Sequence, residues 1–555
     1  MLWVPKTWDE IFDGYRRVWN LLADGLDSLE TAERTRAISI LSDHMRGLCQ
    51  LANLFDMVCD TLDHIADKYP EDRTAIVEAI EQTLHYDGKS FTTEQLATLK
   101  ALRARLVDSD CHSQMMRYVG MDLVQDDFDD TGKYTDTLAP KIQSLAKEAE
   151  ASWQLLEAEL PWLVTDKAKN GFTFGVELGR NDDSSTLLPT LLEAQRQAGD
   201  DGNAFFVSGY FSALFSRDVE RWELTLDQAL EDPRLQGLVP ELTLRSGMTE
   251  RAASRILSLA QSGAIPLASL RMFSFGGVVR KVPEHIFGNW IDCVLASKTK
   301  DGAATAIDLF HFFYQMGNEK RQLPRELTLR VLTADALFTP GKRGFQREDY
   351  DWSQVAHGFL EQHPDDGIAI ARRLIETFGE KGTITDGFNT QAEQVLTTIA
   401  ESAPAAVWSE LSKYLGPPVD TRAFHLGKWL RRGPLVHIPS EEVWKWVDAD
   451  VETRAWYAAT LVPPVVVPPD SAVCLARELL ARYGDRKDVR SNLHANYSTE
   501  AWTGPASSHY LNKLERMEAL RTQETNANVL RWIDEEIESL KYRVEAERIQ
   551  EERGF

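Results

Sequence analysis

Residues 283–332 read PEHIFGNWIDCVLASKTKDGAATAIDLFHFFYQMGNEKRQLPRELTLRVL, and this stretch contains the pattern that predicts the fold. Pro283 and Pro324 lie 41 residues apart, and each is followed three positions later by an apolar residue, Ile286 or Leu327. Proline suits the first turn of a helix, because the N–H that it lacks would be unpaired there. Each proline therefore marks the start of a predicted helix.

The same pattern continues on both sides of this stretch. Prolines recur at intervals of 43, 41, 40, 40 and 35 residues, at Pro240, Pro283, Pro324, Pro364, Pro404 and Pro439. An apolar residue follows five of them after three or four positions: Ile286, Leu327, Ile368, Val407 and Val443. Second apolar helices are predicted between them, over Ile307–Phe313, Trp352–Leu360, Phe388–Ile399 and Phe424–Leu430. HEAT and armadillo repeats have periods of about 40 to 47 residues, so the pattern predicts stacked helix pairs.

Chance is the alternative explanation of this spacing, because the chain has 22 prolines among 555 residues. The shared apolar offset and the intervening helices favour the repeat. Apolar residues also recur at three- and four-residue steps elsewhere, as in Leu51–Ile65 and Val529–Val544. The one strand-like run is LVPPVVVPP at 461–469, whose four prolines cannot donate ladder hydrogen bonds. We therefore expect an all-α, HEAT-like helical-repeat solenoid with a helical N-terminal region and a C-terminal cap.

Changes in composition divide the chain into five predicted segments. Residues 1–118 form an N-terminal helical region, and residues 119–136 form an acidic, turn-rich loop. Residues 137–461 form the HEAT-like repeat array, and the prolines of 462–469 form a linker. Residues 470–555 form a helical cap, whose charged end EAERIQEERGF supplies the polar outer face that a terminal repeat needs.

The net charge favours protein partners over nucleic acid. The formal charge is −25, and so acidic a surface repels phosphate backbones, whereas sequence-independent binding of nucleic acid needs a basic patch. No membrane contact is expected, because no run of about 18 apolar residues occurs. The start, MLWVPKTWDEIF, does not have the pattern of a signal peptide. Five widely spaced cysteines without a CxxC pair indicate a reducing cytoplasm.

Short motifs do not build a complete enzyme, metal or cofactor site. Asp127–Gly132 resembles the start of an EF-hand loop, but position 12 is Leu138 instead of a bidentate glutamate. The pair Gly341–Lys342 lacks the preceding glycine and the following hydroxyl residue of a phosphate-binding loop. The small residues of Ser274–Gly277 and Val207–Tyr210 are expected to let helices approach closely. We therefore expect no cofactor and no metal ion.

The most distinctive local feature is the segment from Arg422 to Trp446, where basic and aromatic residues are interleaved. Such a pattern can hold a nucleic-acid backbone and stack on bases. The tryptophans can also be core residues of two packed helices, an interpretation favoured by the apolar stripes on which Trp429 and Trp444 lie. A protein-binding rim is the third interpretation. The candidate partner-binding residues are Lys428, Trp429, Arg431, Arg432, Trp444, Lys445 and Trp446.

Four further segments stand out: FTFGVELGRND at 172–182, FFVSGYF at 205–211, WTGP at 502–505, and NANVLRW, which begins at Asn526 and continues to EEIESL. Together they resemble the helical-repeat C-terminal regions of large bacterial multidomain proteins. Such regions often accompany an N-terminal nucleotidase, protease or NTPase module, and some of these proteins are linked to anti-phage defence. The resemblance implies a repeat fold and no catalytic residue, and this chain differs in having no recognisable effector module.

These features predict a non-enzymatic scaffold or sensor subunit of a bacterial anti-phage defence system, acting with a separate effector. Its partner would be a protein, either the effector or a phage protein. One alternative is a nucleic-acid-binding helical-repeat accessory protein, which needs a basic concave face. The other is an enzyme whose site is assembled from distant residues, which needs a pocket where acids and histidines converge.

Overall fold

Every regular element in the described part of the chain is a helix. The computed structural model describes residues 7–51, 53–107, 110–122, 136–317, 320–338, 347–377, 386–416, 423, 426–427, 433–463, 474–498 and 502–552. These residues contain no strand, and none of their helices has the length and apolar character needed to cross a membrane. Contacts divide the chain into unit 1, Met1–Ser258, and unit 2, Leu259–Phe555. The five segments predicted from composition stay a prediction.

Unit 1 begins with a group of helices around α2. They are α1 (Trp8–Gly25), α2 (Thr31–Cys49), α3 (Phe55–Lys68), α4 (Arg73–Asp87), α5 (Thr93–Leu106) and α6 (Cys111–Tyr118). Helix α2 packs against α3 and α4, and α4 packs against α5. Ile38, Leu41 and Met45 bury one face of α2, as their three- and four-residue spacing requires. Burial of such a face, more than intrinsic propensity, holds a helix together in water.

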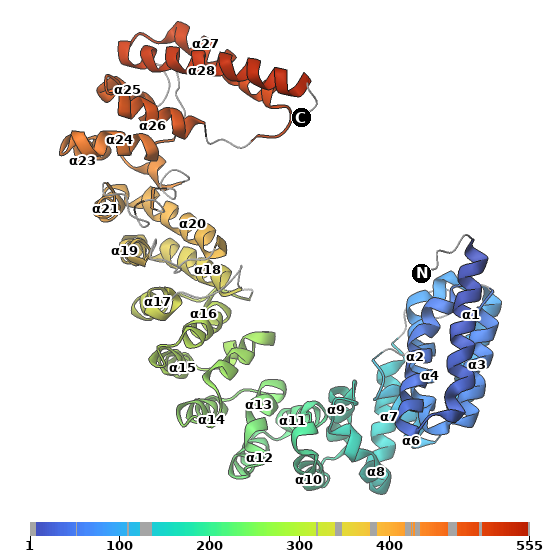
Figure 1. Cartoon of the computed structure of the whole chain (residues 1–555). Coiled ribbons are helices and arrows are strands. Elements are labelled where there is room, and N and C mark those ends of the chain that lie inside the picture. The colour runs from blue at the N-terminus through green and yellow to red at the C-terminus, as the bar shows by residue number, and fades with distance from the viewer. Residues whose placement is uncertain are drawn as a thin grey trace. The chain divides into compact units, whose positions relative to one another are not determined.

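The remaining helices of unit 1 form two rows, as Figure 1 shows. One row contains α7 (Leu138–Ala151), α9 (Gly171–Asn181), α11 (Phe205–Arg217) and α13 (Val239–Ser246). The other contains α8 (Trp153–Leu163), α10 (Leu188–Ala198) and α12 (Val219–Glu231). Helix α9 packs on α7 and α11, and α11 packs on α13. Because successive helices alternate between the rows, each pair forms one layer of a stack. Helix α14 (Glu250–Gln261) ends the unit and extends past its boundary.

Glycines bring α9 and α11 into backbone contact. A Cβ on Gly175 would lie 2.1 Å from the carbonyl oxygen of Phe206. A Cβ on Gly209 would lie 2.0 Å from the carbonyl oxygen of Phe172. Real Cβ atoms do not occupy such positions, so only glycine permits this crossing. The expectation that the small residues of Val207–Tyr210 let helices approach closely is therefore confirmed.

Unit 2 repeats the two-row arrangement over its length (Figure 1). One row consists of α15 (Glu284–Ala296), α17 (Arg325–Leu332), α19 (Gly367–Thr377), α21 (Pro404–Leu411), α23 (Ser440–Asp448) and α25 (Leu475–Tyr483). The other includes α16 (Lys300–Tyr314), α18 (Arg347–Gln362), α20 (Asp386–Ser402), α24 (Val451–Leu461) and α26 (Lys487–Tyr497). Within this second row, α16 packs on α18, α18 on α20, and α24 on α26. The prediction of an all-α, HEAT-like helical repeat is confirmed for the described residues.

The prolines lie where the sequence pattern predicts. Pro283, Pro324 and Pro439 immediately precede α15, α17 and α23, and Pro404 is the first residue of α21. Pro364 opens the 3-10 turn η8 (Pro364–Asp366) that leads into α19. The predicted second helices at 307–313, 352–360 and 388–399 fall inside α16, α18 and α20. Most of Phe424–Leu430 lies outside the described residues.

The last two helices of unit 2 pack side by side. They are α27 (Ala506–Gln523) and α28 (Ala527–Glu552), and α28 also packs on α25. Val529, Ile533 and Ile537 bury the inner face of α28. Trp502, from the WTGP segment, stacks on His509 with ring centroids 4.6 Å apart. The apolar stripe from Val529 to Val544 thus forms the helix that it predicts.

Ser274–Gly277 differs from its expected role in helix packing. The residues belong to η6 (Leu267–Lys281), whose 3-10 turns are interrupted by non-helical backbone at Phe275. Gly276 and Gly277 have φ of +63° and +68°, and nothing lies within 4 Å of a Cβ placed on Gly277. These glycines are therefore required by a left-handed backbone, where a side chain is disfavoured, and not by a close approach of helices.

Candidate binding groove

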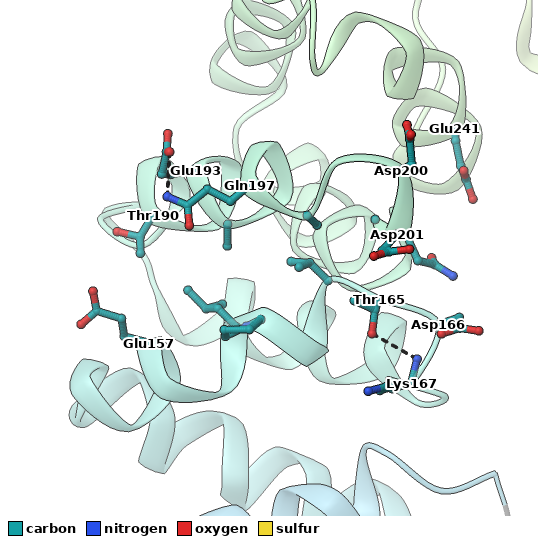
Figure 2. A pocket seen from close by; sticks show the side chains of 17 residues that line it. Glu157, Thr165, Asp166, Lys167, Thr190, Glu193, Gln197, Asp200, Asp201 and Glu241 are labelled. Atoms are coloured by element: carbon teal, nitrogen blue, oxygen red, sulfur yellow. Dashed lines mark hydrogen bonds between the residues drawn. The ribbon is translucent and has the colours of Figure 1, made fainter. Parts of the chain in front are cut away.

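A groove opens in unit 1 between α8 and α10, and Figure 2 shows it from close by. Its volume is about 1170 Å³. Its walls come from α8 and the turn that follows, from α10 and the 3-10 turn η4 (Gly199–Asp201), and from Glu241 of α13. Drug-sized ligands occupy pockets of about 300–1,000 Å³, so this space suits a longer occupant.

Apolar side chains line the middle of the groove. Leu160 of α8 and Val164, just after α8, are buried, and Ala194 and Ala198 of α10 also line the groove. Pro161, in the last turn of α8, completes this apolar lining. A ligand that contacts these groups removes apolar surface from water, which stabilises the complex by about 25 cal/mol per Å² of buried area. The apolar lining therefore offers a surface for an apolar stretch of a ligand.

Carboxylates flank the apolar lining at both ends. In Figure 2, Glu157 and Glu193 lie at one end, and Asp166, Asp200 and Asp201 lie at the other. Glu241 lies beside the second group, and Lys167 is the one basic residue among the described residues that line the groove. These two groups are called here the acidic ends, and together with Glu241 they place six carboxylates against one ammonium group in the described lining. A concave surface lined by one sign of charge concentrates the opposite sign in its mouth.

Four of the six carboxylates have no partner among the described residues. Glu157, Asp166, Asp200 and Asp201 make no hydrogen bond or ion pair there. Glu193 does: it pairs with Arg196 and accepts a 2.9 Å hydrogen bond from the side-chain amide of Gln197. These interactions, that of Gln197 first and then that of Arg196, lower the pKa of Glu193. A carboxylate held ionised suits the attraction of a cation better than the donation of a proton.

Hydrogen bonds fix the turns that build the second acidic end. The backbone N–H of Asn203 donates to the carbonyl of Val164 at 2.6 Å, joining the turn after α8 to the turn before α11. The side-chain oxygen of Asn203 accepts from the N–H of Phe205 at 2.8 Å, at the start of α11. Arg196 Nε donates to Asp232 Oδ2 at 2.6 Å and ties α10 to the end of α12. The groove is thus formed in the folded chain, which lowers the entropic cost of binding.

The predicted partner-binding segment is only partly described. Lys428, Trp429, Arg431 and Arg432 lie outside the described residues. Trp444 is buried, and its Nε1 donates to Glu478 of α25 at 2.5 Å, so its ring belongs to the core of the repeat.

Lys445 and Trp446 of the same helix differ from Trp444 in exposure. Lys445 is exposed, and Trp446 is half-buried. The Trp446 ring lies edge-on to Trp408 with centroids 5.8 Å apart, and the guanidinium of Arg454 lies 4.9 Å from its centroid. The structure therefore directs Trp444 and Trp446 toward different neighbours, and a partner-binding role for Lys445 and Trp446 stays a prediction.

Other motifs noted in the sequence add no site. The EF-hand-like segment from Asp127 and the Gly341–Lys342 pair fall outside the described residues. Where the structure describes the chain, no three His, Cys, Asp or Glu side chains are grouped so as to hold a metal ion.

Sequence reasoning missed the groove. The acidic turns at Asp166 and Asp200–Asp201 are visible in the sequence, but their facing arrangement depends on how α8 and α10 stack.

Comparisons with known proteins identify no family. No family model matches the chain, and no curated protein matches it. One solved structure, described as a circular tandem repeat protein with novel repeat topology and enhanced subunit contact surfaces, aligns with 94% of this chain and 98% of its own. The sequence identity is 11% and the TM-score is 0.16. This match carries no argument about the fold, and the helical repeat is assigned from the helices themselves.

Proposed function

We propose that this chain is a non-enzymatic scaffold or sensor subunit that binds a protein partner. The observation that carries the proposal is the groove of unit 1, with its apolar lining and with four carboxylates that have no partner among the described residues. Among the residues that the structure describes, no histidine or cysteine lines the groove, so they do not place there the paired nucleophile and imidazole base of many hydrolases. Stacked helical repeats commonly present such extended binding surfaces.

The partner that we propose is a separate effector of a bacterial anti-phage defence system. This part of the proposal rests on the resemblance of the FTFGVELGRND, FFVSGYF, WTGP and NANVLRW segments to helical regions of large multidomain proteins. Those proteins often carry an effector module beside the helical region. A scaffold subunit of the kind proposed here would bring a separate effector into place by binding it.

Affinity capture with matched variants tests the proposal. The full chain is immobilised as wild type, as Asp200→Asn/Asp201→Asn in the groove, and as Asp43→Asn/Asp60→Asn on the exposed faces of α2 and α3. Both double variants remove two negative charges, so they differ only in where the charge is lost. Lysate of the source cells is applied with and without nuclease, at two salt concentrations.

We expect one protein to be retained by the wild type and by the α2/α3 variant, and to be depleted at least about fivefold by the groove variant. Retention should survive nuclease treatment. Nucleic acid retained by all three chains and removed by salt would overturn the proposal in favour of a nucleic-acid-binding repeat. Equal retention of the protein by both double variants would show that the groove is not its binding site.

A further inference from the structure

Resting on the proposed function, we infer the chemical class of the partner: the groove binds a protein segment that carries Lys or Arg at both ends of a short apolar stretch. The arrangement of the lining supplies the pattern. Glu157 and Glu193 form one acidic end, Asp166, Asp200 and Asp201 form the other, and carbon-only side chains lie between them in Figure 2. A segment that binds along the groove therefore contacts carboxylates at each end and an apolar surface between them.

Charge decides between a cationic and an anionic occupant. Within the described residues, each acidic end has at least one carboxylate without a partner: Glu157 at the first, and Asp166, Asp200 and Asp201 at the second. Ammonium and guanidinium groups would supply the missing charge-assisted hydrogen bonds. A phosphate backbone would be repelled by both ends, and Lys167 alone does not offset six carboxylates.

The apolar lining decides between a basic protein segment and a small polycation. A polyamine also carries charges at its two ends, but its interior is a thin methylene chain that would leave most of about 1170 Å³ filled with water. Leucine-sized side chains would fill the space against Leu160, Val164 and Ala194 and add apolar burial. A peptide thus uses both features of the groove, whereas a polyamine uses one.

Two synthetic peptides and one polyamine test the inference. The first peptide has two lysines at each end of a leucine–alanine stretch, and the second has glutamates in place of the lysines. Spermine is the small polycation. Binding of each fluorescent peptide, and its displacement by spermine, is measured by anisotropy with the wild-type chain and with the two double variants described above.

We expect the lysine peptide to bind the wild type, to bind Asp200→Asn/Asp201→Asn at least about tenfold more weakly, and to bind Asp43→Asn/Asp60→Asn within about twofold of the wild type. Its affinity should fall with added salt, since these carboxylates are exposed. The glutamate peptide should not bind. Circular dichroism of the groove variant should match that of the wild type, because neither aspartate side chain makes a hydrogen bond or ion pair within the part of the chain that the structure describes.

Three results would overturn the inference. They are failure of the lysine peptide to bind the wild type, an equal loss of its affinity in both double variants, and binding of spermine as tight as that of the peptide. The first result would place the partner in another chemical class. The second would show that the net charge of the chain, and not the groove, attracts the peptide. The third would show that the groove is a simple cation site. A captured protein that is still lost from the groove variant would leave the proposed function standing while this inference falls.

Discussion

At the scale of single residues, Asp182 determines how α10, one wall of the groove, is held. It is 3% exposed at the end of α9. It accepts hydrogen bonds from the backbone N–H groups of Thr186 and Leu187 at 2.9 and 2.8 Å, and from the Tyr210 hydroxyl at 2.6 Å. One carboxylate thus joins the end of α9, the turn into α10 and the middle of α11.

Replacement of Asp182 by asparagine should therefore destabilise unit 1. An amide has one acceptor oxygen in place of two, so at least one buried donor loses its partner, at a cost of about 1–3 kcal/mol in the free energy of unfolding. Urea unfolding of Asp182→Asn measures this cost at pH 7. The matched control is Asp183→Asn, because Asp183 is the exposed neighbour and its side chain has no partner in the described part of the chain. Equal stability of the two variants would contradict the role given to Asp182.

The pH dependence of the same variant follows from the direction of the pKa shift. Burial opposes ionisation of Asp182, but the hydrogen bonds from Tyr210, Leu187 and Thr186 outweigh it and lower the pKa. A lowered folded-state pKa contributes stability above the unfolded pKa of about 3.9, and this stability is lost as the pH falls through the folded pKa. The stability difference between wild type and Asp182→Asn should therefore shrink when unfolding is repeated at acid pH.

The sequence predicts the structural roles of some residues and not those of others. The stretch FTFGVELGRND ends on Asp182, but no sequence pattern indicates that Tyr210 donates to it from another helix. The core position of Trp444 could be predicted, because an apolar stripe indicates which face of a helix is buried. The role of the groove carboxylates could not be predicted, since a solvated acidic turn and an acidic turn that lies opposite a second acidic turn have the same local sequence.

At the scale of elements, the crossing of α9 and α11 depends on Gly209. A methyl group there would meet the Phe172 carbonyl oxygen, so the helices must separate. Gly209→Ala should lower the free energy of unfolding by about 1–3 kcal/mol through overpacking. Gly47→Ala in α2 is the control, because nothing lies within 4 Å of its Cβ and alanine favours the helix by about 0.5–1 kcal/mol. Urea unfolding of both variants should give shifts of opposite sign, and shifts of the same sign would contradict the packing explanation.

Most helices could be predicted, because the spacing of prolines and apolar residues along the sequence indicates them. The prolines before α15, α17 and α23 open helices whose apolar stripes follow at fixed offsets. The interruption in η6 could not be predicted in the same way. Glycine at 276 and 277 permits either a close helix contact or a left-handed backbone, and only the structure distinguishes them.

At the scale of the whole molecule, ion pairs join successive repeats of unit 2 at nearly the repeat distance. Arg325 pairs with Asp366, 41 residues later, and Arg372 pairs with Glu410, 38 residues later. Near the C-terminal end, Arg477 forms two hydrogen bonds with Glu524, at 2.7 and 2.9 Å and 47 residues apart. Because each pair links neighbours, the stability of the stack includes many interface contributions of the same kind.

These pairs predict a loss of stability of unit 2 in acid. The hydrogen bond from Arg325 lowers the pKa of Asp366. Burial opposes ionisation of Glu524, but the Arg477 hydrogen bond and the backbone N–H groups of Asn526 and Thr525 outweigh it, so the pKa of Glu524 is lowered as well. Both groups contribute stability above unfolded pKa values of about 3.9 and 4.3, and that stability is lost as the pH falls through the folded values.

Glu524→Gln isolates one such contribution. The Glu524 side chain is fully buried, and its loss of charge leaves the Arg477 guanidinium without its carboxylate, so we expect a cost of about 1–3 kcal/mol at pH 7. The matched control is Glu518→Gln, which removes an exposed pair with Lys541 and should cost less than about 0.5 kcal/mol. Thermal unfolding at pH 7 and at successively lower pH should show Glu524→Gln approaching the wild type as the native carboxylate protonates. A constant difference at every pH would mean that the side chain acts through packing alone, and the acid sensitivity of unit 2 would need another source.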